Sequence, residues 1–310
     1  MQKSVLVIGS GIAGISASLK LKTYGIDSFI IDKGRFIGGR ISSREIKDTN
    51  ETNYFFHGAQ FFTAKTHEFK KIISTGVNGK YIKEFGNFDP KRYRGNKTMR
   101  DFLLNLSKKL HIQQKVKIIG IKSDDNKIKV LDNKIKEWIS YDGVISTLPA
   151  PQNCELLNQF PSLQKTLNTG SYHACIALMF TFDEIPQGLK TYYDFYKKPG
   201  ILSWMASGSN LNVWTAHTNE KFSDLNYHKD KGFLKEKILS SIKQFFFGSK
   251  IKFHSLHVWR YAKGAKKCLG PQIDPKYPVA IAGDFLEGPN VEAAFISGNK
   301  AANLIFNRLK

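Results

Sequence analysis

The sequence predicts an α/β protein in which a Rossmann-type dinucleotide-binding domain carries an inserted, mostly antiparallel α+β domain. Three observations lead to this fold class. A glycine-rich turn at residues 9–14 separates a short apolar run from an apolar helix, and Asp32 ends a second apolar run. Aromatic-rich segments that alternate apolar and polar residues fill 172–262, and short apolar runs like those of the first segment return near residue 279.

The first element is a strand, turn and helix that suits a dinucleotide. Its glycines permit a sharp turn, let the backbone approach a pyrophosphate and let the helix pack on the strand. The helix N-terminus attracts phosphate charge, and Asp32, 23 residues after Gly9, is placed to hold ribose hydroxyls. A glycine turn that merely packs tightly would not explain Asp32. The expected contacts are Gly9, Gly11, Ile12, Ala13, Gly14, Asp32 and Lys33.

The middle of the chain predicts further elements of the same domain, followed by segments in which apolar and polar residues alternate. We expect a helix over 97–110, strands over 116–121 and 127–131, and a buried strand over 141–146. Antiparallel strands are expected at 172–182, 201–206, 211–217 and 251–262, with one amphipathic helix over 229–247.

The last forty residues predict a return to the first sheet, through a short strand at 279–282, a turn at Gly283-Asp284 and a helix from Val291 to near Leu309. The dinucleotide-binding domain is therefore expected to be discontinuous, formed by 1–65, 98–152 and 270–310. The remaining segments, 66–97 and 153–269, are expected to form the substrate domain.

Composition predicts a globular enzyme. The chain has 310 residues, 41% hydrophobic and 13% aromatic, which is enough for a full core. Its three cysteines are far apart and suit a reducing, cytoplasmic compartment, and no apolar run reaches the length of a membrane span. The net charge of +21 comes from scattered lysines, so drift in composition explains it about as well as a polyanionic partner does. We do not expect nucleic acid as a partner.

A second glycine pair extends the first motif. The segment from Asp32 to Gly38-Gly39-Arg40 resembles the signature of the flavin-containing amine oxidase superfamily, and Gly283-Asp284 resembles its second flavin motif. The resemblance implies a glutathione-reductase-like domain that binds FAD, with Gly39 and Arg40 at the pyrophosphate and Asp284 at a ribityl hydroxyl. It places Val116 at the adenine, although core packing explains that residue equally well. Gly283, Val291 and Glu292 would adjoin the flavin, and no cysteine stands there for a covalent link.

Within that superfamily the chain is most similar to the renalase-like enzymes. The similarity is carried by residues 57–63, Met99, residues 257–262 and residues 282–285. It implies that Gly58, Ala59 and Gln60 lie beside the isoalloxazine ring, that Trp259 walls the nicotinamide site and that His217 lies near the flavin. An equally good interpretation is that His217 is a structural residue at a strand end, with its hydrogen bonds satisfied by neighbouring groups. Gln60 and Phe61 are also expected to line the substrate pocket, Phe61 at a position where relatives often have tyrosine. We assign His57 no role.

The renalase resemblance implies a reaction. Such enzymes oxidise dihydro-NAD(P) isomers, reduced at nicotinamide C2 or C6, to NAD(P)+. Hydride passes to flavin N5, and O2 reoxidises the flavin with release of H2O2. This transfer needs positioning more than acid–base groups.

Other functions remain as alternatives. They are an amine oxidase of the same superfamily, a polyene desaturase or isomerase, and more remotely a flavin-bound binding protein without turnover. No metal is expected, since His254 and His257 point to opposite faces of one strand.

Overall fold

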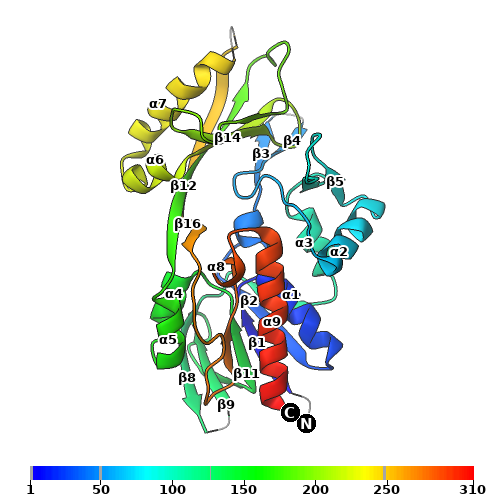
Figure 1. The fold of residues 1–310 in the computed structure, drawn as a ribbon, viewed down its shortest axis with the longest axis vertical. Coiled ribbons are helices and arrows are strands. Elements are labelled where there is room, and N and C mark those ends of the chain that lie inside the picture. The colour runs from blue at the N-terminus through cyan, green and yellow to red at the C-terminus, as the bar shows by residue number, and fades with distance from the viewer. Residues whose placement is uncertain (1–2, 49–50, 126, 247–248) are drawn as a thin grey trace. The chain divides into compact units, whose positions relative to one another are not determined.

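The computed structural model describes residues 3–48, 51–125, 127–246 and 249–310, and these form two compact units (Figure 1). Unit 1 comprises Met1–Gly39, Leu103–Ser171 and Gly264–Lys310, and unit 2 comprises Arg40–Phe102 and Tyr172–Lys263. The predicted boundaries differ from this division. Residues 40–65 and 98–102 belong to unit 2, and residues 153–171 and 264–269 belong to unit 1. Which segments bind cofactor and which bind substrate stays a prediction.

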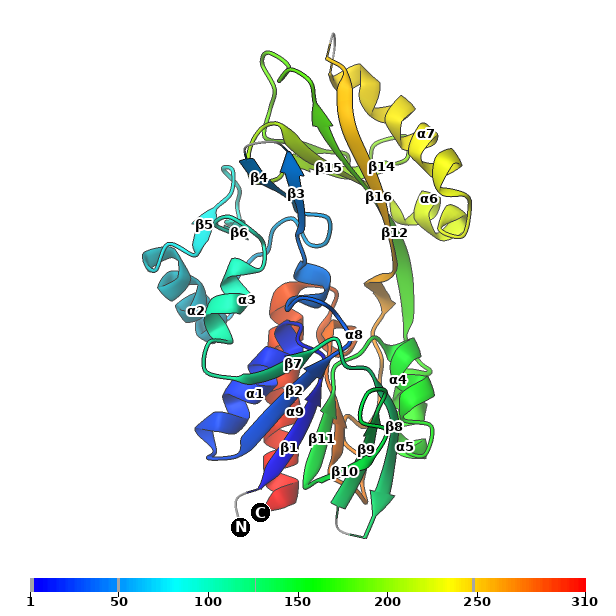
Figure 2. The same ribbon diagram turned by 180° about the vertical axis from the view of Figure 1, so that it is seen from behind.

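Unit 1 is built on a parallel sheet of five strands in the order β17-β11-β1-β2-β7. Figure 2 shows these strands side by side. Val5, Leu6 and Val7 of β1 are fully buried, because both faces of this sheet are covered. The C-terminal strand is paired to β11, which confirms the expected return of the chain to its first sheet. The strands are β1 (Ser4–Ile8), β2 (Asp27–Asp32), β7 (His111–Gln114), β11 (Gly143–Ser146) and β17 (Val279–Ile281).

Two helices, α1 (Ile12–Thr23) and α9 (Val291–Leu309), pack against each other beside this sheet. Gly298 makes the close approach possible, because a Cβ there would collide with the carbonyl oxygen of Ala13. The Ser16 hydroxyl donates to the carbonyl of Phe295 at 2.9 Å. The two ends of the chain are therefore tied together in one layer.

The second sheet of unit 1 is antiparallel, in the order β10-β9-β8, and contacts β1 and β11. Its strands confirm two expected segments with small shifts. The expected strand 141–146 is divided, since Tyr141 ends β10 and Gly143 begins β11. Its strands are β8 (Ile118–Asp124), β9 (Lys127–Asp132) and β10 (Trp138–Tyr141). Unit 1 also contains the short helices α4 (Ala150–Leu156), α5 (Pro161–Leu167) and α8 (Asp284–Glu287).

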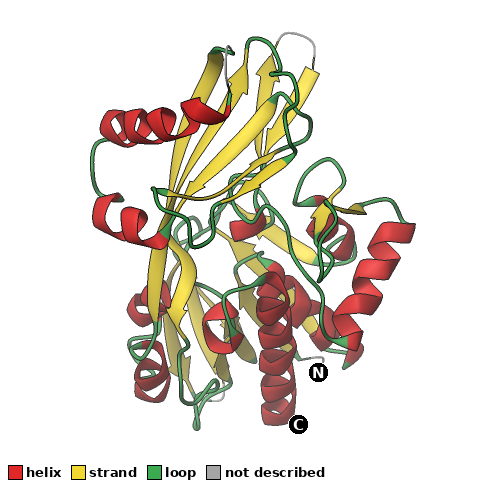
Figure 3. Cartoon of the chain, turned by 45° about the horizontal axis from the view of Figure 1, so that its top comes forward, coloured by secondary structure: helices red, strands yellow, loops and turns green. Residues whose placement is uncertain are grey.

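Unit 2 is built on a sheet of five strands in the order β13-β14-β15-β12-β16, seen with its helices in Figure 3. The pairs β12–β15, β13–β14 and β14–β15 are antiparallel, as the alternating sequence predicts. Its strands are β12 (Ser171–Phe182), β13 (Tyr192–Asp194), β14 (Leu202–Ser207), β15 (Val213–Thr218) and β16 (Ile251–Lys266).

The two faces of this sheet are covered differently. On one face, Met205, Trp214 and Ala216 pack with Leu234 and Ile238 of α7 (Lys231–Ile242). The opposite face, here called face A, carries the side chains of Trp204, Ala206, Val213, Thr215 and His217, which alternate with the first set or lie opposite one another in the register. Phe55 and Phe85 pack on face A.

Short elements complete unit 2. They are β3 (Arg44–Asp48), β4 (Glu51–Phe55), α2 (His67–Asn78), β5 (Ile82–Glu84), β6 (Tyr93–Gly95) and the one-turn helices η1 (Gly39–Ile41) and η2 (Lys243–Phe245). Helix α7 begins after its cap Asp230 and ends before η2, so the expected helix over 229–247 is shorter than predicted, and Phe247 lies outside the described residues.

The expected helix over 97–110 is wrong in length. Only α3 (Asp101–Leu106) forms. The Asp101 carboxylate accepts hydrogen bonds from the N–H groups of Lys97 and Thr98 at 2.6 and 3.1 Å. These bonds close a turn that precedes the helix, which begins at Asp101.

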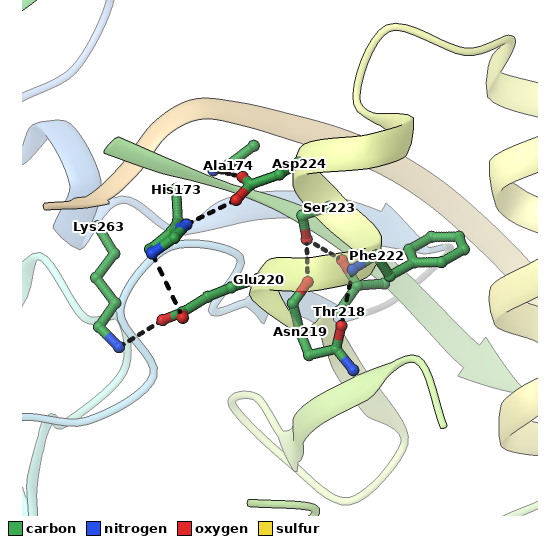
Figure 4. A network of polar contacts seen from close by, with 9 residues as sticks. All are labelled: His173, Ala174, Thr218, Asn219, Glu220, Phe222, Ser223, Asp224 and Lys263. Atoms are coloured by element: carbon green, nitrogen blue, oxygen red, sulfur yellow. Dashed lines mark hydrogen bonds and ion pairs between the residues drawn. The ribbon is translucent and has the colours of Figure 1, made fainter. Parts of the chain in front are cut away.

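A polar network fixes α6 (Glu220–Asn226) to the sheet of unit 2 (Figure 4). Asn219 caps the helix, its side-chain oxygen accepting from the N–H of Phe222 at 2.9 Å. Asp224 binds the N–H of Ala174 at 2.8 Å and the ring of His173 at 2.6 Å. Glu220 pairs with Lys263 of β16 at 2.7 Å. The start of α6 is thus joined to β12 and β16.

Across the described ranges, none of the helices is both long and apolar enough to span a bilayer.

Candidate functional site

The glycine turn after β1 has the geometry that the sequence predicts. Gly9 has φ +105°, which favours glycine, and a Cβ on Gly14 would collide with the carbonyl oxygen of Gly9. Gly11 is different, because a Cβ built there meets no atom within 4 Å. Two glycines of the turn serve close packing, and the third leaves open space at the N-terminus of α1, beside the buried Ile12 and Ala13.

The second glycine pair lies against this turn. The Gly38 N–H donates to the Ser10 carbonyl at 3.1 Å, and a Cβ on Gly39 would lie 3.7 Å from the Gly11 Cα. Gly39 has φ +52°. The two motifs therefore form one cradle of backbone, open at Gly11, which fits a pyrophosphate at a helix N-terminus.

Asp32 is held by the turn that it follows. Its carboxylate accepts from the Ser10 N–H at 2.6 Å, the Ser10 hydroxyl at 2.7 Å and the Gly34 N–H at 2.6 Å. An ionised carboxylate has about four acceptor sites, so it can still accept from a ribose hydroxyl. Ser10 is a residue that sequence reasoning missed, since its fully buried hydroxyl becomes visible only as the partner of Asp32.

Val116 and Lys33 are adjacent to Asp32 but already have partners. The Val116 N–H donates to the Asp32 carbonyl at 3.1 Å, and the Val116 side chain is buried. The ammonium of Lys33 donates to the Gln152 side chain at 3.0 Å. Val116 therefore lies beside Asp32, and its side chain belongs to the core, while the adenine contact that the resemblance implies stays a prediction.

The C-terminal motif provides a second turn and helix start in unit 1. A Cβ on Gly283 would collide with the ring of Phe285, and the Gly283 N–H donates to the Ser297 hydroxyl at 2.9 Å. Asp284 follows as a buried acid. Helix α9 begins at Val291, as predicted, with Asn290 as its cap accepting from the Ala293 N–H at 2.8 Å. Glu292 is buried in its first turn. The positive end of this long helix suits an electron-rich ligand group.

In unit 2, the carbonyl of His57 brings two predicted site residues together. The indole N–H of Trp259 donates to it at 2.8 Å, and Nε2 of His217 lies 3.1 Å from it. Because a carbonyl can only accept, Nε2 of His217 carries the proton. The His57 ring stacks on Trp259 with centroids 5.3 Å apart and meets His257 edge-on. His57 is thus the centre of the cluster, although no role is predicted for it from the sequence.

Gln60 joins the same cluster, and Gly58 and Ala59, which precede it, contact the backbone of Arg40. Its side-chain nitrogen lies 3.3 Å from both the Thr215 carbonyl and Nε2 of His217. The Ala59 N–H donates to the Arg40 carbonyl at 2.8 Å, and a Cβ on Gly58 would collide with that carbonyl. The Arg40 guanidinium donates to the carbonyls of Tyr261 and Ala262 at 3.4 and 3.3 Å. Arg40 therefore already binds β16, whereas the sequence predicts a role at the pyrophosphate.

Burial keeps the histidines of this cluster neutral. Loss of solvent lowers the pKa of His57 to about 3, with the charges of His257 and Arg44 adding to the shift. Loss of solvent also lowers the pKa of His217 to about 4. At neutral pH both rings therefore act as uncharged hydrogen-bonding groups.

Phe61 lies apart from these contacts, beside Trp204 of face A with ring centroids 5.2 Å apart. Two arginines that the sequence did not single out for this site accompany it. Arg92 lies over the Phe61 ring, and the buried Arg94 donates to the Gln60 carbonyl at 2.7 Å. The basic run Lys91-Arg92-Tyr93-Arg94 is visible in the sequence, where an exposed surface is the favoured interpretation, but no local pattern marks Arg94 as buried.

Among the residues that the structure describes, no three or more His, Cys, Asp or Glu side chains are grouped so that they could hold a metal ion.

Comparison with known proteins identifies the fold. Residues 7–74 match the model of an NAD(P)-binding Rossmann-like domain. A stretch of 46 residues is 46% identical to lysine-specific histone demethylase 1 of Caenorhabditis elegans, covering 15% of this chain and 6% of that protein.

Solved structures match over nearly the whole chain. A putative protoporphyrinogen oxidase from Exiguobacterium sp. 255-15 has a TM-score of 0.78 and 11% identity, with 99% of each chain covered. Cyclohexylamine oxidase from Brevibacterium oxydans IH-35A has a TM-score of 0.77 and 11% identity over 100% of both chains. A putrescine oxidase variant has a TM-score of 0.77 and 11% identity, covering 99% of each chain. The fold is therefore that of these oxidases, with a Rossmann-like dinucleotide-binding domain, as the sequence predicts.

Proposed function

We propose that this protein is an FAD-dependent oxidoreductase of the renalase type, which oxidises dihydro-NAD(P) isomers reduced at C2 or C6 to NAD(P)+. The observation that carries the cofactor assignment is the open side of Gly11, where a Cβ would meet no atom within 4 Å beside the backbone of Gly39. Bound FAD supplies a two-electron acceptor that O2 can regenerate, giving H2O2.

The residues of unit 1 fit the long, charged shape of FAD. Gly9, Gly11 and the first turn of α1, with Gly39, face the pyrophosphate, and Asp32 accepts from the ribose. Val116 lies at the adenine end. Asp284 binds a ribityl hydroxyl, and the α9 N-terminus at Val291 and Glu292 stabilises negative charge on the ring. We also assign four residues of unit 2 to the cofactor, namely Arg40, Gly58, Ala59 and Gln60. The cofactor is bound without a covalent link.

The cluster around the His57 carbonyl is assigned to the substrate. Trp259 and His217 are held by hydrogen bonds of 2.8 and 3.1 Å, so their rings provide fixed walls. The neutral His217 and the amide of Gln60 would orient a carboxamide. Oxidation of a dihydropyridine breaks one C–H bond as hydride and needs no protein base, and the second proton of H2O2 comes from solvent. Positioning is therefore the main task of these residues.

The cofactor assignment is tested on the purified protein before any turnover. We expect a yellow protein whose FAD is released by heat or acid, with a ratio near one FAD per chain by absorbance. A colourless protein that binds no added FAD would contradict the cofactor assignment and, with it, the proposed function.

The substrate assignment is tested by anaerobic mixing with 6-dihydro-NAD. We expect bleaching of the flavin absorbance, one NAD+ formed per FAD, and one H2O2 per NAD+ after air is admitted. The control is ordinary 4-dihydro-NAD, which we expect to react much more slowly.

An amine oxidase is the second candidate, because two of the structural matches are named putrescine oxidase and cyclohexylamine oxidase. The same anaerobic assay with putrescine and cyclohexylamine separates the two. Fast bleaching by an amine, without reaction of 6-dihydro-NAD, would favour this alternative.

A further inference from the structure

Two arginines next to face A have more hydrogen-bonding capacity than their surroundings use. Arg92 directly precedes β6 and Arg94 lies within it, so the extended backbone points both side chains to the same side. The Arg92 guanidinium carbon lies 3.8 Å from the ring centre of Phe88, 4.2 Å from that of Phe61 and 5.0 Å from that of Trp204. Arg92 is therefore surrounded by aromatic rings.

Arg94 lies deeper, with 2% of its surface exposed. Its Nε donates to the Gln60 carbonyl at 2.7 Å and one terminal nitrogen donates to the Ser207 carbonyl at 2.9 Å. The guanidinium carbon lies 3.2 Å from the centre of the Phe85 ring. These contacts fix the plane of the guanidinium, but its second terminal nitrogen is buried without a partner.

Several other buried polar atoms of this region also have no partner. They include Nη1 of Arg92, and no hydrogen bond leaves the Arg92 side chain for another residue of the described segments. Burying a polar atom without a partner is costly, so the unpaired N–H donors of Arg92 and Arg94 indicate a missing polar ligand. The others are Oε1 of Gln60, Oγ1 of Thr215 and Nε1 of Trp204, the last two on face A.

The charges around Arg94 also favour an anionic ligand, because positive groups lie together there. Lys83 stands directly opposite Arg94 in the β5–β6 pair, an arrangement that is unfavourable for like charges. Burial lowers the pKa of Arg94 to about 9, and no described carboxylate opposes that shift. Asp194 acts on Arg92 and Asp101 acts on Lys83. A buried cation without an acid is costly, and an anionic ligand would remove that cost.

We propose that Arg92, with Arg94 behind it, forms an anion-binding subsite that selects planar substrates carrying a carboxylate or phosphate group. This inference rests on the proposed function and narrows its substrate class. The rings of Phe61, Phe88 and Trp204 give a planar molecule a stacking surface, and the guanidinium of Arg92 pairs with two oxygens of its anionic group. A protonated amine is repelled by the same charges.

The experiment uses the FAD-loaded protein and isothermal titration calorimetry with three probes. Benzoate carries a planar ring and a carboxylate, benzamide is its neutral isostere, and inorganic phosphate supplies the other anion. We expect benzoate to bind at least about tenfold more tightly than benzamide, with a Kd near or below about 1 mM. Saturable phosphate binding with weak benzoate binding supports the subsite and identifies phosphate as the group recognised.

Two variants provide the matched test. Arg92→Gln removes the proposed anion partner, and Lys91→Gln removes the same charge from an exposed neighbour that pairs with Glu84 at 2.8 Å. We expect Arg92→Gln to weaken anion binding at least about tenfold and to leave benzamide unchanged, and Lys91→Gln to change neither affinity more than about twofold. Arg92→Lys, which keeps the charge and loses the planar fork, should lie between them.

The outcomes separate this inference from the proposed function. If the wild-type protein binds benzoate and benzamide equally and does not bind phosphate, or if Arg92→Gln behaves as Lys91→Gln does, the subsite is overturned. If Arg92→Gln does not fold, the comparison of probes on the wild-type protein decides. A protein that contains FAD and bleaches with 6-dihydro-NAD, but shows no preference for anions, keeps its proposed function and loses only this inference.

Discussion

The indole N–H of Trp259 donates to the carbonyl oxygen of His57 at 2.8 Å, across 202 positions of sequence. Nε2 of His217 lies 3.1 Å from the same oxygen. One backbone carbonyl thus fixes two aromatic side chains from β15 and β16. Their fixed orientation is the basis of the first prediction.

Replacement of Trp259 by phenylalanine should impair the proposed reaction more than the fold. The variant keeps a ring and loses one hydrogen bond, so we expect a loss of about 1 kcal/mol in unfolding free energy. Flavin bleaching by 6-dihydro-NAD should slow by about tenfold or more, because the wall of the substrate site is no longer fixed. Trp138→Phe, at an exposed tryptophan, is the control. Equal bleaching rates in the two variants would remove Trp259 from the substrate site.

Alanine at Gly11 and alanine at Gly14 should have opposite effects. Gly11 has φ −73° and open space around a Cβ, so G11A should keep its stability within about 0.5 kcal/mol and weaken FAD binding by about tenfold or more. G14A forces a methyl group against the Gly9 carbonyl and should destabilise the fold by about 1–3 kcal/mol. Denaturant unfolding and FAD titration of each apoprotein measure both. Unchanged FAD affinity in G11A would contradict the cradle.

Acid should destabilise the protein through its buried histidines. In the unfolded chain they titrate near pH 6.5, whereas burial lowers the pKa of His217 to about 4 and that of His57 to about 3. Between these values the unfolded state binds more protons. Unfolding free energy therefore falls as pH decreases from about 6.5 to about 4, by up to about 1.4 kcal/mol per pH unit for each histidine.

This dependence is measured by urea unfolding at several pH values. His217→Gln removes one titrating group, so its slope of unfolding free energy against pH should be smaller than that of the wild-type protein by up to about 1.4 kcal/mol per pH unit. An identical slope in the two proteins would show that His217 is not held neutral.

The network at the start of α6 should depend on its cap more than on its ion pair. Asn219→Ala leaves the Phe222 N–H without its side-chain acceptor and should cost about 1 kcal/mol. Lys263→Met breaks an exposed pair with Glu220 and should cost less than about 0.5 kcal/mol. Thermal unfolding of both variants checks the order, and a larger loss in Lys263→Met would reverse the assignment.

The sequence predicts what is decided locally. The turn at Gly9–Gly14 and the helix that begins at Val291 follow from glycine geometry and from a capping residue within a few positions. The expected helix over 97–110 is too long at its start, where the Asp101 carboxylate binds the N–H groups of Lys97 and Thr98 in a turn that precedes α3.

The cluster around the His57 carbonyl depends on distant strands, and less of it can be predicted from the sequence. His57 is important in the structure because β15 and β16 bring His217 and Trp259 to its carbonyl. Arg94 is buried because the Gln60 and Ser207 carbonyls accept its hydrogen bonds. No pattern in the residues next to His57 or Arg94 in the sequence predicts either arrangement.

The pairing of β17 with β11 has a consequence for synthesis on the ribosome. More than a hundred residues separate the two strands, and all of unit 2 beyond Tyr172 is translated between them. At roughly 5–20 residues per second, β11 waits for several seconds as an unpaired edge on the nascent chain. We expect newly made chains to be open to aggregation or chaperone capture during that interval, and to gain protease resistance in unit 1 only after Val279–Ile281 has emerged.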